Sequence, residues 1–152
     1  MIPFKKILCP IDFSEPSYEA LKAANELALH FSAELCLIHV VSLVPILPAS
    51  PDPAAFNVPL YQEELEASSK KSLQEAVEKR ISKGLHAYQI VVEGDAAYQI
   101  VRIAQEENAE LIVMATHGQT GWRRLIFGSV AAKVIRLATC PVLTIHAPHE
   151  EG

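Results

Sequence analysis

Short apolar runs alternate with segments of helical periodicity along this chain, and this alternation restricts its fold more than any other feature. Runs typical of strands covered on both faces occupy 7–11, 35–41, 88–92, 110–114 and 142–145. Apolar residues at helical spacing predict helices over 15–31, 61–83, 96–106 and 129–137. Strand–helix–strand units of this size favour parallel strands joined by right-handed crossovers. The pattern predicts one doubly wound α/β domain over residues 1–152, with a five-stranded parallel sheet and helices on both faces.

Residues that favour helix ends and loops punctuate this pattern. Ser14 and Asp95 are predicted N-caps, because a short polar side chain can accept a hydrogen bond from the first helical turn. Gly84 is expected to close the second helix. The stretch 42–59 holds half of the 10 prolines, so it is predicted to be a loop. It fits either a plain connector or a partial lid over a nearby ligand.

Charge and cysteine content exclude several classes of partner. The net charge is -5, and no run of Lys and Arg could follow a phosphate backbone, so neither nucleic acid nor an anionic membrane is an expected partner. No apolar span approaches the roughly 18 residues of a membrane helix, and no signal-peptide core is present. The three cysteines are widely spaced, and Cys9 and Cys36 lie in apolar runs, which is typical of reduced thiols in a cytoplasmic protein.

The order of the strands decides which of their ends meet. A chain that winds outward to its third strand and then returns past the first gives the order 3-2-1-4-5. Ligands of open parallel sheets bind at the carboxyl ends of the strands, where the winding reverses. Asp12, Val40 and residues 115–118 are therefore expected to share one crevice.

A glycine-bearing stretch joins the fourth strand to the last helix. Glycines occur at 118, 121 and 128, and Ser129 then opens the helical pattern. Glycine lets backbone N–H groups approach a ligand, and the first turn of a helix has unpaired donors at its positive end. The expected ligand is an anion, and above all a phosphate. The sequence has no P-loop, no GxGxxG after the first strand and no GxSxG. It therefore predicts no recognisable set of catalytic residues.

The spacing of this stretch resembles a known signature. The residues Ala115-Thr116-His117-Gly118, followed by nine others and then Gly128-Ser129, resemble the nucleotide signature of the ATP-binding branch of the universal stress protein (UspA-like) family. Ala115 stands where that signature begins with glycine. The segments 5–15 and 140–143 are also similar to the family, so the resemblance extends over nearly the whole chain.

The resemblance implies a fold, a ligand and a set of binding residues. The fold would be that of the adenine nucleotide alpha-hydrolase-like proteins, and the ligand would be ATP with Mg²⁺ or Mn²⁺ carried on its phosphates. Asp12 would lie toward the ribose, and the backbone of Val40 would read the adenine. The implied nucleotide-binding residues are Pro10, Ile11, Asp12, Val40, Met114, Ala115, His117, Gly118, Gly128, Ser129 and Val130.

Three functions remain open at this point. The chain could be an ATP-binding stress-response module, a slow ATP hydrolase using the same pocket, or an interaction module that has lost nucleotide affinity through Ala115 and Gln119. Individual side chains also have two interpretations. Asp12 fits a turn or helix cap as well as a ribose contact, and His117 fits a loop-shaping hydrogen bond as well as a ligand contact.

Other polar side chains have plainer interpretations. His39, alone in an apolar run, is expected to be a hydrogen-bonded core residue, and His146 has no predicted ligand cluster to join. Trp122 fits either packing that anchors its loop or stacking on a partner. Arg123 and Arg124 fit a solvated face, and one of them could instead neutralise a phosphate.

The last strand, Val142–Ile145, is predicted to lie at a sheet edge. Its unpaired N–H and C=O groups, beside apolar side chains, would normally be covered. Antiparallel pairing of two such edges closes on itself, so a homodimer through this strand is expected, as the family resemblance also implies.

Overall fold

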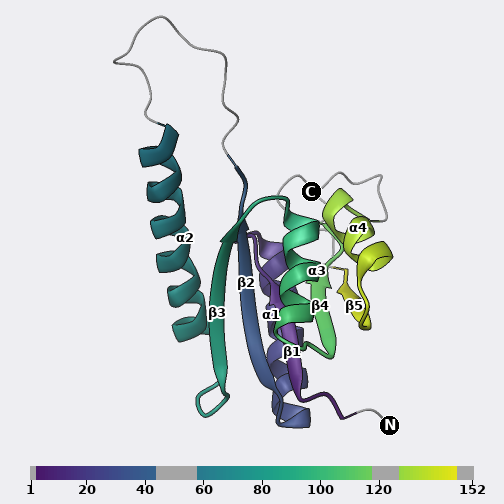
Figure 1. The fold of residues 1–152 in the computed structure, drawn as a ribbon. Helices are drawn as coiled ribbons and strands as arrows, with labels where there is room; N and C mark the ends of the chain where they lie inside the picture. Colours follow the sequence, from purple (N-terminus) through teal and green to yellow (C-terminus); the bar gives the residue numbers. More distant parts are fainter. Residues whose placement is uncertain (1–2, 44–57, 118–126, 147–152) are drawn as a thin grey trace, which may run out of the picture.

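The computed structural model describes residues 3–43, 58–117 and 127–146. Strands and helices alternate strictly through these ranges (Figure 1): β1 Lys6–Pro10, α1 Glu15–Phe31, β2 Glu34–Val41, α2 Val58–Arg80, β3 Ala87–Glu93, α3 Ala96–Glu106, β4 Leu111–Ala115, α4 Ser129–Leu137 and β5 Val142–Ile145. The strands form a five-stranded sheet of order β3-β2-β1-β4-β5, and every pair is parallel. The predicted doubly wound α/β fold is therefore confirmed.

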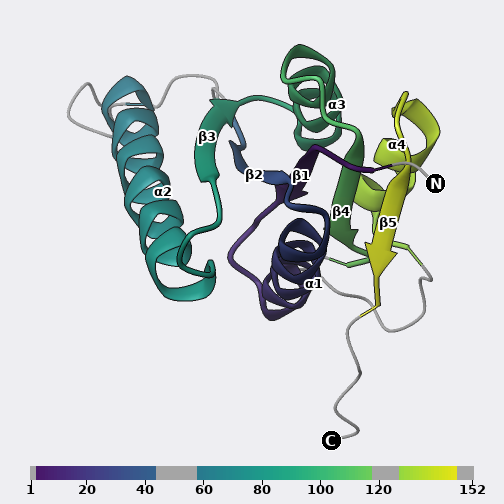
Figure 2. The same ribbon diagram turned by 90° about the horizontal axis from the view of Figure 1, so that it is seen from below.

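Two layers of helices cover the sheet (Figure 2), and each has its own apolar core. One core joins the sheet to α1 and α2, and the other joins it to α3 and α4. Successive residues of β1 serve opposite cores: Ile7 and Cys9 pack toward α1, whereas Leu8 packs toward α3, and all three are fully buried. A strand buried on both faces needs apolar residues at every position, which explains why the runs show no alternation.

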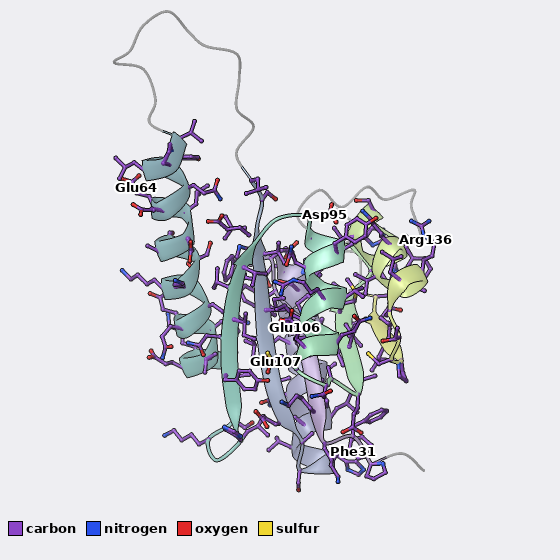
Figure 3. The ribbon with its side chains drawn as sticks, viewed as in Figure 1. Phe31, Glu64, Asp95, Glu106, Glu107 and Arg136 are labelled. Carbon is purple, nitrogen blue, oxygen red and sulfur yellow. The ribbon has the colours of Figure 1, made fainter. Side chains whose placement is uncertain are left out.

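The predicted N-caps are confirmed. The hydroxyl of Ser14 accepts a hydrogen bond from Ser17 N at 3.3 Å at the start of α1. Asp95 Oδ2 accepts one from Tyr98 N at 3.1 Å at the start of α3, at the upper end of that helix in Figure 3. Each cap satisfies one of the orphan donors of its first helical turn.

The limits of α2 differ from those expected. The helix begins at Val58, so Pro59 lies in its first turn and not in the preceding loop. Proline is tolerated there, because a first-turn N–H has no partner within the helix. The helix ends at Arg80, before Gly84, which has φ +88° in the turn that leads to β3. The lid or connector role predicted for 42–59 falls mostly on residues 44–57, outside the described residues.

Four strands differ by one residue at one or both ends from the predicted ranges, and the last strand and the helices α3 and α4 match them. Thus β1 and β4 are shifted by one residue, β2 starts one residue earlier, and β3 extends one residue at each end. Such shifts are within the ordinary uncertainty of element limits.

The thiols are free, as predicted. Cys9 and Cys36 are buried, and Cys140 is partly buried. Burial raises the pKa of Cys36 to about 12 and the pKa of Cys9 further still. These two thiols therefore stay protonated and unreactive over the physiological pH range.

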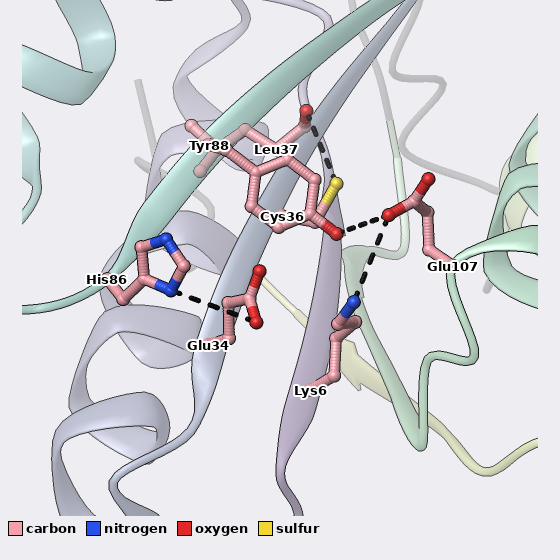
Figure 4. A network of polar contacts seen from close by, with 7 residues as sticks. All are labelled: Lys6, Glu34, Cys36, Leu37, His86, Tyr88 and Glu107. Carbon is pink, nitrogen blue, oxygen red and sulfur yellow. Dashed lines mark hydrogen bonds and ion pairs between the residues drawn. The ribbon is translucent and has the colours of Figure 1, made fainter.

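A polar network lies at the amino ends of the strands, away from their carboxyl ends (Figure 4). Tyr88 Oη donates to Glu107 Oε2 at 2.6 Å, and Lys6 Nζ lies 3.9 Å from the same oxygen. Burial, and then the bond to Glu107, raise the pKa of the Tyr88 hydroxyl. The network ties the end of α3 to β1 and β3, which leaves the opposite end of the sheet as the place for a site.

No helix in the described ranges has the length and apolar character that crossing a membrane requires.

Candidate functional site

A pocket of about 350 Å³ opens at the carboxyl ends of β1, β2 and β4. These strand ends lie at the top of the sheet in Figure 1. This is where the winding of the sheet reverses, as predicted. The predicted site residues within the described ranges all line it: Pro10, Ile11, Asp12, Val40, Met114, Ala115, His117, Gly128, Ser129 and Val130. Gly118, Gln119, Trp122, Arg123 and Arg124 lie outside the described residues, so their predicted roles stay predictions.

The turn after β1 shapes one wall of the pocket. Ile11 N donates to Ile38 O at 2.8 Å, which continues the pairing of β1 with β2 just past the strand. His39 Nδ1 lies 2.7 Å from Ile11 O, and its ring packs on Phe13 at a centroid distance of 4.5 Å. Phe13 has φ 65°, so the chain turns sharply there. The structural role predicted for His39 is confirmed, although the residue also lines the pocket.

Asp12 shapes the turn before α1 and also lines the pocket. Its Oδ1 accepts hydrogen bonds from the backbone N of Ser14, at 3.0 Å, and from the Ser14 hydroxyl. The carboxylate thereby orders the start of α1, and the residue also lines the pocket. The turn role is confirmed, and the contact with a ribose stays a prediction.

The backbone of Val40 faces the pocket because β1 is shorter than β2. Ile38 O points toward β1, where it accepts from Ile11 N. Backbone groups two residues apart along a strand point the same way, so the N–H and C=O of Val40 also point to the β1 side. The ladder of β1 and β2 ends at the pair Pro10 and Ile38. Val40 therefore presents one donor and one acceptor side by side at the pocket wall.

The start of α4 forms the opposite wall. Gly128 is its N-cap residue and, as a glycine, has no side chain with which to cap the first turn. Gly128 N donates to Thr116 O at 2.6 Å, and a Cβ on Gly128 would lie 3.2 Å from that oxygen. Its φ is -67°, so glycine is needed here for close approach to the end of β4 and not for a left-handed conformation. The first turn of α4 thus brings its N–H groups and positive dipole end to the pocket.

Ala115 is compatible with this arrangement. It is the last residue of β4 and has extended backbone, which any L residue can adopt. Its methyl group therefore causes no backbone strain where the family signature has glycine.

The first turns of α1 and α3 complete the lining through residues that the sequence interpretation did not assign. Ser17, in α1, is buried and donates its hydroxyl hydrogen to Ser14 O at 2.8 Å. Ala96 is the first residue of α3. Both are small residues in a helical turn that follows a strand end, and that position is the only signal that could have identified them.

An ion pair joins the N-cap of α3 to α4, beside the pocket residue Ala96. Lys133 Nζ lies 3.3 Å from Asp95 Oδ2 and 3.9 Å from the centre of the Tyr98 ring. The hydrogen bond from Tyr98 N holds the pKa of Asp95 below its usual range, and Lys133 adds to this effect. The pair is partly solvated, so its main consequence is to keep two helix starts together.

Thr116 links the pocket to the end of β5. Its backbone N donates to Ile145 O at 3.0 Å, and its side chain is almost fully buried. Its Oγ1 lies 3.1 Å from His117 Nδ1 and 3.2 Å from His146 Nδ1. His117 thus has the loop-shaping hydrogen bond that was one of its two interpretations, and it also lines the pocket. His146, for which no neighbouring cluster was predicted, meets Thr116 because β4 and β5 are paired.

In the part of the chain that the structure describes, no three His, Cys, Asp or Glu side chains gather to hold a metal ion.

A family model and a curated relative both place this chain in the same family. The model of the universal stress protein family matches residues 3–146. The universal stress protein MJ0531 of Methanocaldococcus jannaschii is 37% identical over 148 residues, which are 97% of this chain and 85% of the relative.

Two solved structures have the same fold. Protein MJ0577 of Methanocaldococcus jannaschii superposes with a TM-score of 0.80 at 27% identity, covering 98% of this chain and 100% of that protein. The universal stress protein of Archaeoglobus fulgidus, solved in complex with dAMP, superposes with a TM-score of 0.67 at 22% identity, covering 94% and 98% of the two chains. The sheet order, the family model and these relatives agree, and this chain belongs to the universal stress protein family.

Proposed function

We propose that this protein binds ATP in the pocket and acts as a nucleotide-dependent stress-response module. The observation that carries the proposal is the meeting of two backbone features in one pocket. The start of α4 has a glycine N-cap and suits phosphates, and the exposed backbone pair of Val40 suits a base edge. A pocket of about 350 Å³ is within the range of small-molecule sites.

Each part of the nucleotide has a complementary group. Adenine has an adjacent donor and acceptor, which the C=O and N–H of Val40 match. The carboxylate of Asp12 can accept a hydrogen bond from a ribose hydroxyl. Phosphate oxygens would meet the N–H groups of Ser129 and Val130 and the hydroxyl of Ser129. A Mg²⁺ or Mn²⁺ ion would arrive bound to the phosphate oxygens, as is usual for these cations.

A structure of the same fold was solved with an adenine nucleotide, dAMP, at 22% identity to this chain. The ligand class is proposed for this chain from its own pocket residues. The hydroxyl of Thr116 meets the imidazole of His117 in the pocket, but Thr116 is almost fully buried, which favours a nucleotide-holding role over rapid hydrolysis.

ATP is expected to bind in preference to GTP. Guanine presents a carbonyl oxygen and a ring N–H where adenine presents an amino group and a ring nitrogen, so it reverses the donor and acceptor order that Val40 matches. Calorimetric titration with each nucleotide in the presence of magnesium measures the difference, and phosphate release from the same samples measures turnover. Equal affinities would contradict the base-reading role of Val40, and the absence of binding to either would refute the proposed function.

We also propose that two copies associate through β5, in the cytoplasm. The strand lies at the sheet edge, and Leu143 is 39% exposed on it. An unpaired edge of this kind favours pairing with a second, identical edge. The free thiols support a reducing compartment.

A further inference from the structure

The Thr116 hydroxyl stands between the Nδ1 atoms of two histidines. The distances, 3.1 Å to His117 and 3.2 Å to His146, are hydrogen-bond distances to both. The two rings also lie edge to face, with their centroids 6.0 Å apart. The Thr116 side chain is 5% exposed, which leaves little access for bulk water to replace either bond.

The number of protons that these three side chains can share limits the tautomers of the two histidines. A threonine hydroxyl has one proton to donate and two lone pairs to accept with, and a neutral imidazole carries its proton on one nitrogen only. Thr116 can therefore donate to one Nδ1, and the other Nδ1 must carry a proton and donate to Oγ1. When both rings are neutral, satisfying both contacts requires that the two histidines have opposite tautomers.

We propose that His146 is a positioning residue for the pocket, which acts through Thr116 to fix the tautomer of His117. In this arrangement His146 Nδ1–H donates to Thr116 Oγ1, and the Thr116 hydroxyl donates to His117 Nδ1. His117 then carries its proton on Nε2. The opposite assignment, with Nδ1–H on His117 and Nε2–H on His146, would satisfy the same two contacts. The choice between them rests on the proposed function, because a donor at His117 Nε2 suits a pocket that holds anionic phosphate oxygens.

Backbone geometry makes this relay rigid. Thr116 N donates to Ile145 O, and Thr116 O accepts from Gly128 N. The residue is thus tied to the end of β5 and to the start of α4 at once, which fixes the position of its backbone between the two rings. His146, which follows β5 directly, is held beside it by the same contact.

The tautomers can be measured on the intact protein without any nucleotide. Long-range proton–nitrogen NMR spectra of histidine-labelled protein distinguish Nδ1–H from Nε2–H. The spectra are recorded at alkaline pH, because only a neutral imidazole has a distinct tautomer. We expect Nε2–H for His117 and Nδ1–H for His146. Finding the same tautomer on both rings, or the two tautomers exchanged, would overturn the proposal.

Variants of Thr116 test whether the hydroxyl transmits the effect. Thr116→Val keeps the shape but removes the hydroxyl that accepts from His146 Nδ1–H, so the His146 signal should shift away from that of Nδ1–H. Thr116→Ser should keep the parent tautomers. His86→Ala, at an exposed histidine beside β3, is the matched control and should change neither ring. An unchanged His146 signal in Thr116→Val would show that Thr116 does not determine it.

Nucleotide affinity provides the second readout. Thr116→Val should weaken ATP binding roughly tenfold, about the loss of one ordinary hydrogen bond, and Thr116→Ser should restore it. Should the parent protein bind no ATP, the proposed function fails while the tautomer measurement still decides whether the rings have opposite tautomers. Should ATP bind equally to the parent and to Thr116→Val, the relay has no role in binding.

Discussion

Replacing Gly128 with valine is expected to lower the affinity for ATP by more than about a hundredfold. A Cβ at this position would lie 3.2 Å from Thr116 O and 3.6 Å from His117 Cα, both backbone atoms that cannot turn aside. The start of α4 would have to move away from β4, and its N–H groups would no longer point toward the phosphates. Hydrogen bonds to charged groups contribute roughly 1.5 to 3 kcal/mol each, so losing two of them reaches that magnitude.

Calorimetry on the variant measures this loss, and thermal unfolding shows whether the fold survives. Gly84→Ala is the matched control, because Gly84 has φ +88° with no atom within 4 Å of an added Cβ. That change should strain the backbone and lower stability while leaving ATP binding intact. Ser129→Ala gives an intermediate case, with a loss of roughly ten- to a hundredfold from one charged hydrogen bond. A folded Gly128→Val variant that binds as the parent does would show that the phosphates lie elsewhere.

Replacing Thr144 with proline is expected to convert a dimer into a folded monomer. On β5, Pro141 O and Ile145 O accept from β4, so alternate residues point inward and the N–H of Thr144 points away from the sheet. Proline removes that outward donor and adds bulk where a second copy would pair. The bonds between β4 and β5 do not use this N–H, so the subunit itself should stay intact, as edge prolines generally allow.

Light scattering coupled to gel filtration measures the mass of the parent and of the variant. Thr144→Val, which keeps the N–H, is the matched control and should remain dimeric. Circular dichroism should show the same helix and strand content in all three proteins. A monomeric parent, or a Thr144→Pro variant that is still a dimer, would contradict an interface through β5.

Much of the pocket could be predicted from the sequence because it depends on backbone topology. Continuous apolar runs identify strands buried on both faces, and the winding order then brings the ends of β1, β2 and β4 together whatever their side chains are. Asp12, Val40 and Gly128 followed from that step and from spacing. The limits of α2 were predicted less well, because Pro59 fits a loop and a first helical turn equally.

Side-chain contacts between distant segments were beyond such reasoning. Thr116 and His146 meet only because β5 pairs with β4 in one particular register, with Ala115 opposite Ile145. Nothing in the composition of either segment fixes that register. Ser17 and Ala96 were missed for a different reason: small residues in a first helical turn are too common to signal a pocket.

The central position of β1 has a consequence for the kinetics of folding. β1 pairs with β2, its sequence neighbour, and also with β4, where Ile7 lies opposite Leu111. That second pairing closes a loop of most of the chain, so it is entropically expensive and comes late. Residues of β4 line the pocket, so we expect a nucleotide to bind only after β4 has docked and the barrier has been crossed. Such a nucleotide should leave the refolding rate unchanged and lower the unfolding rate. It would slow the separation of β4 and β5 from β1, β2 and β3.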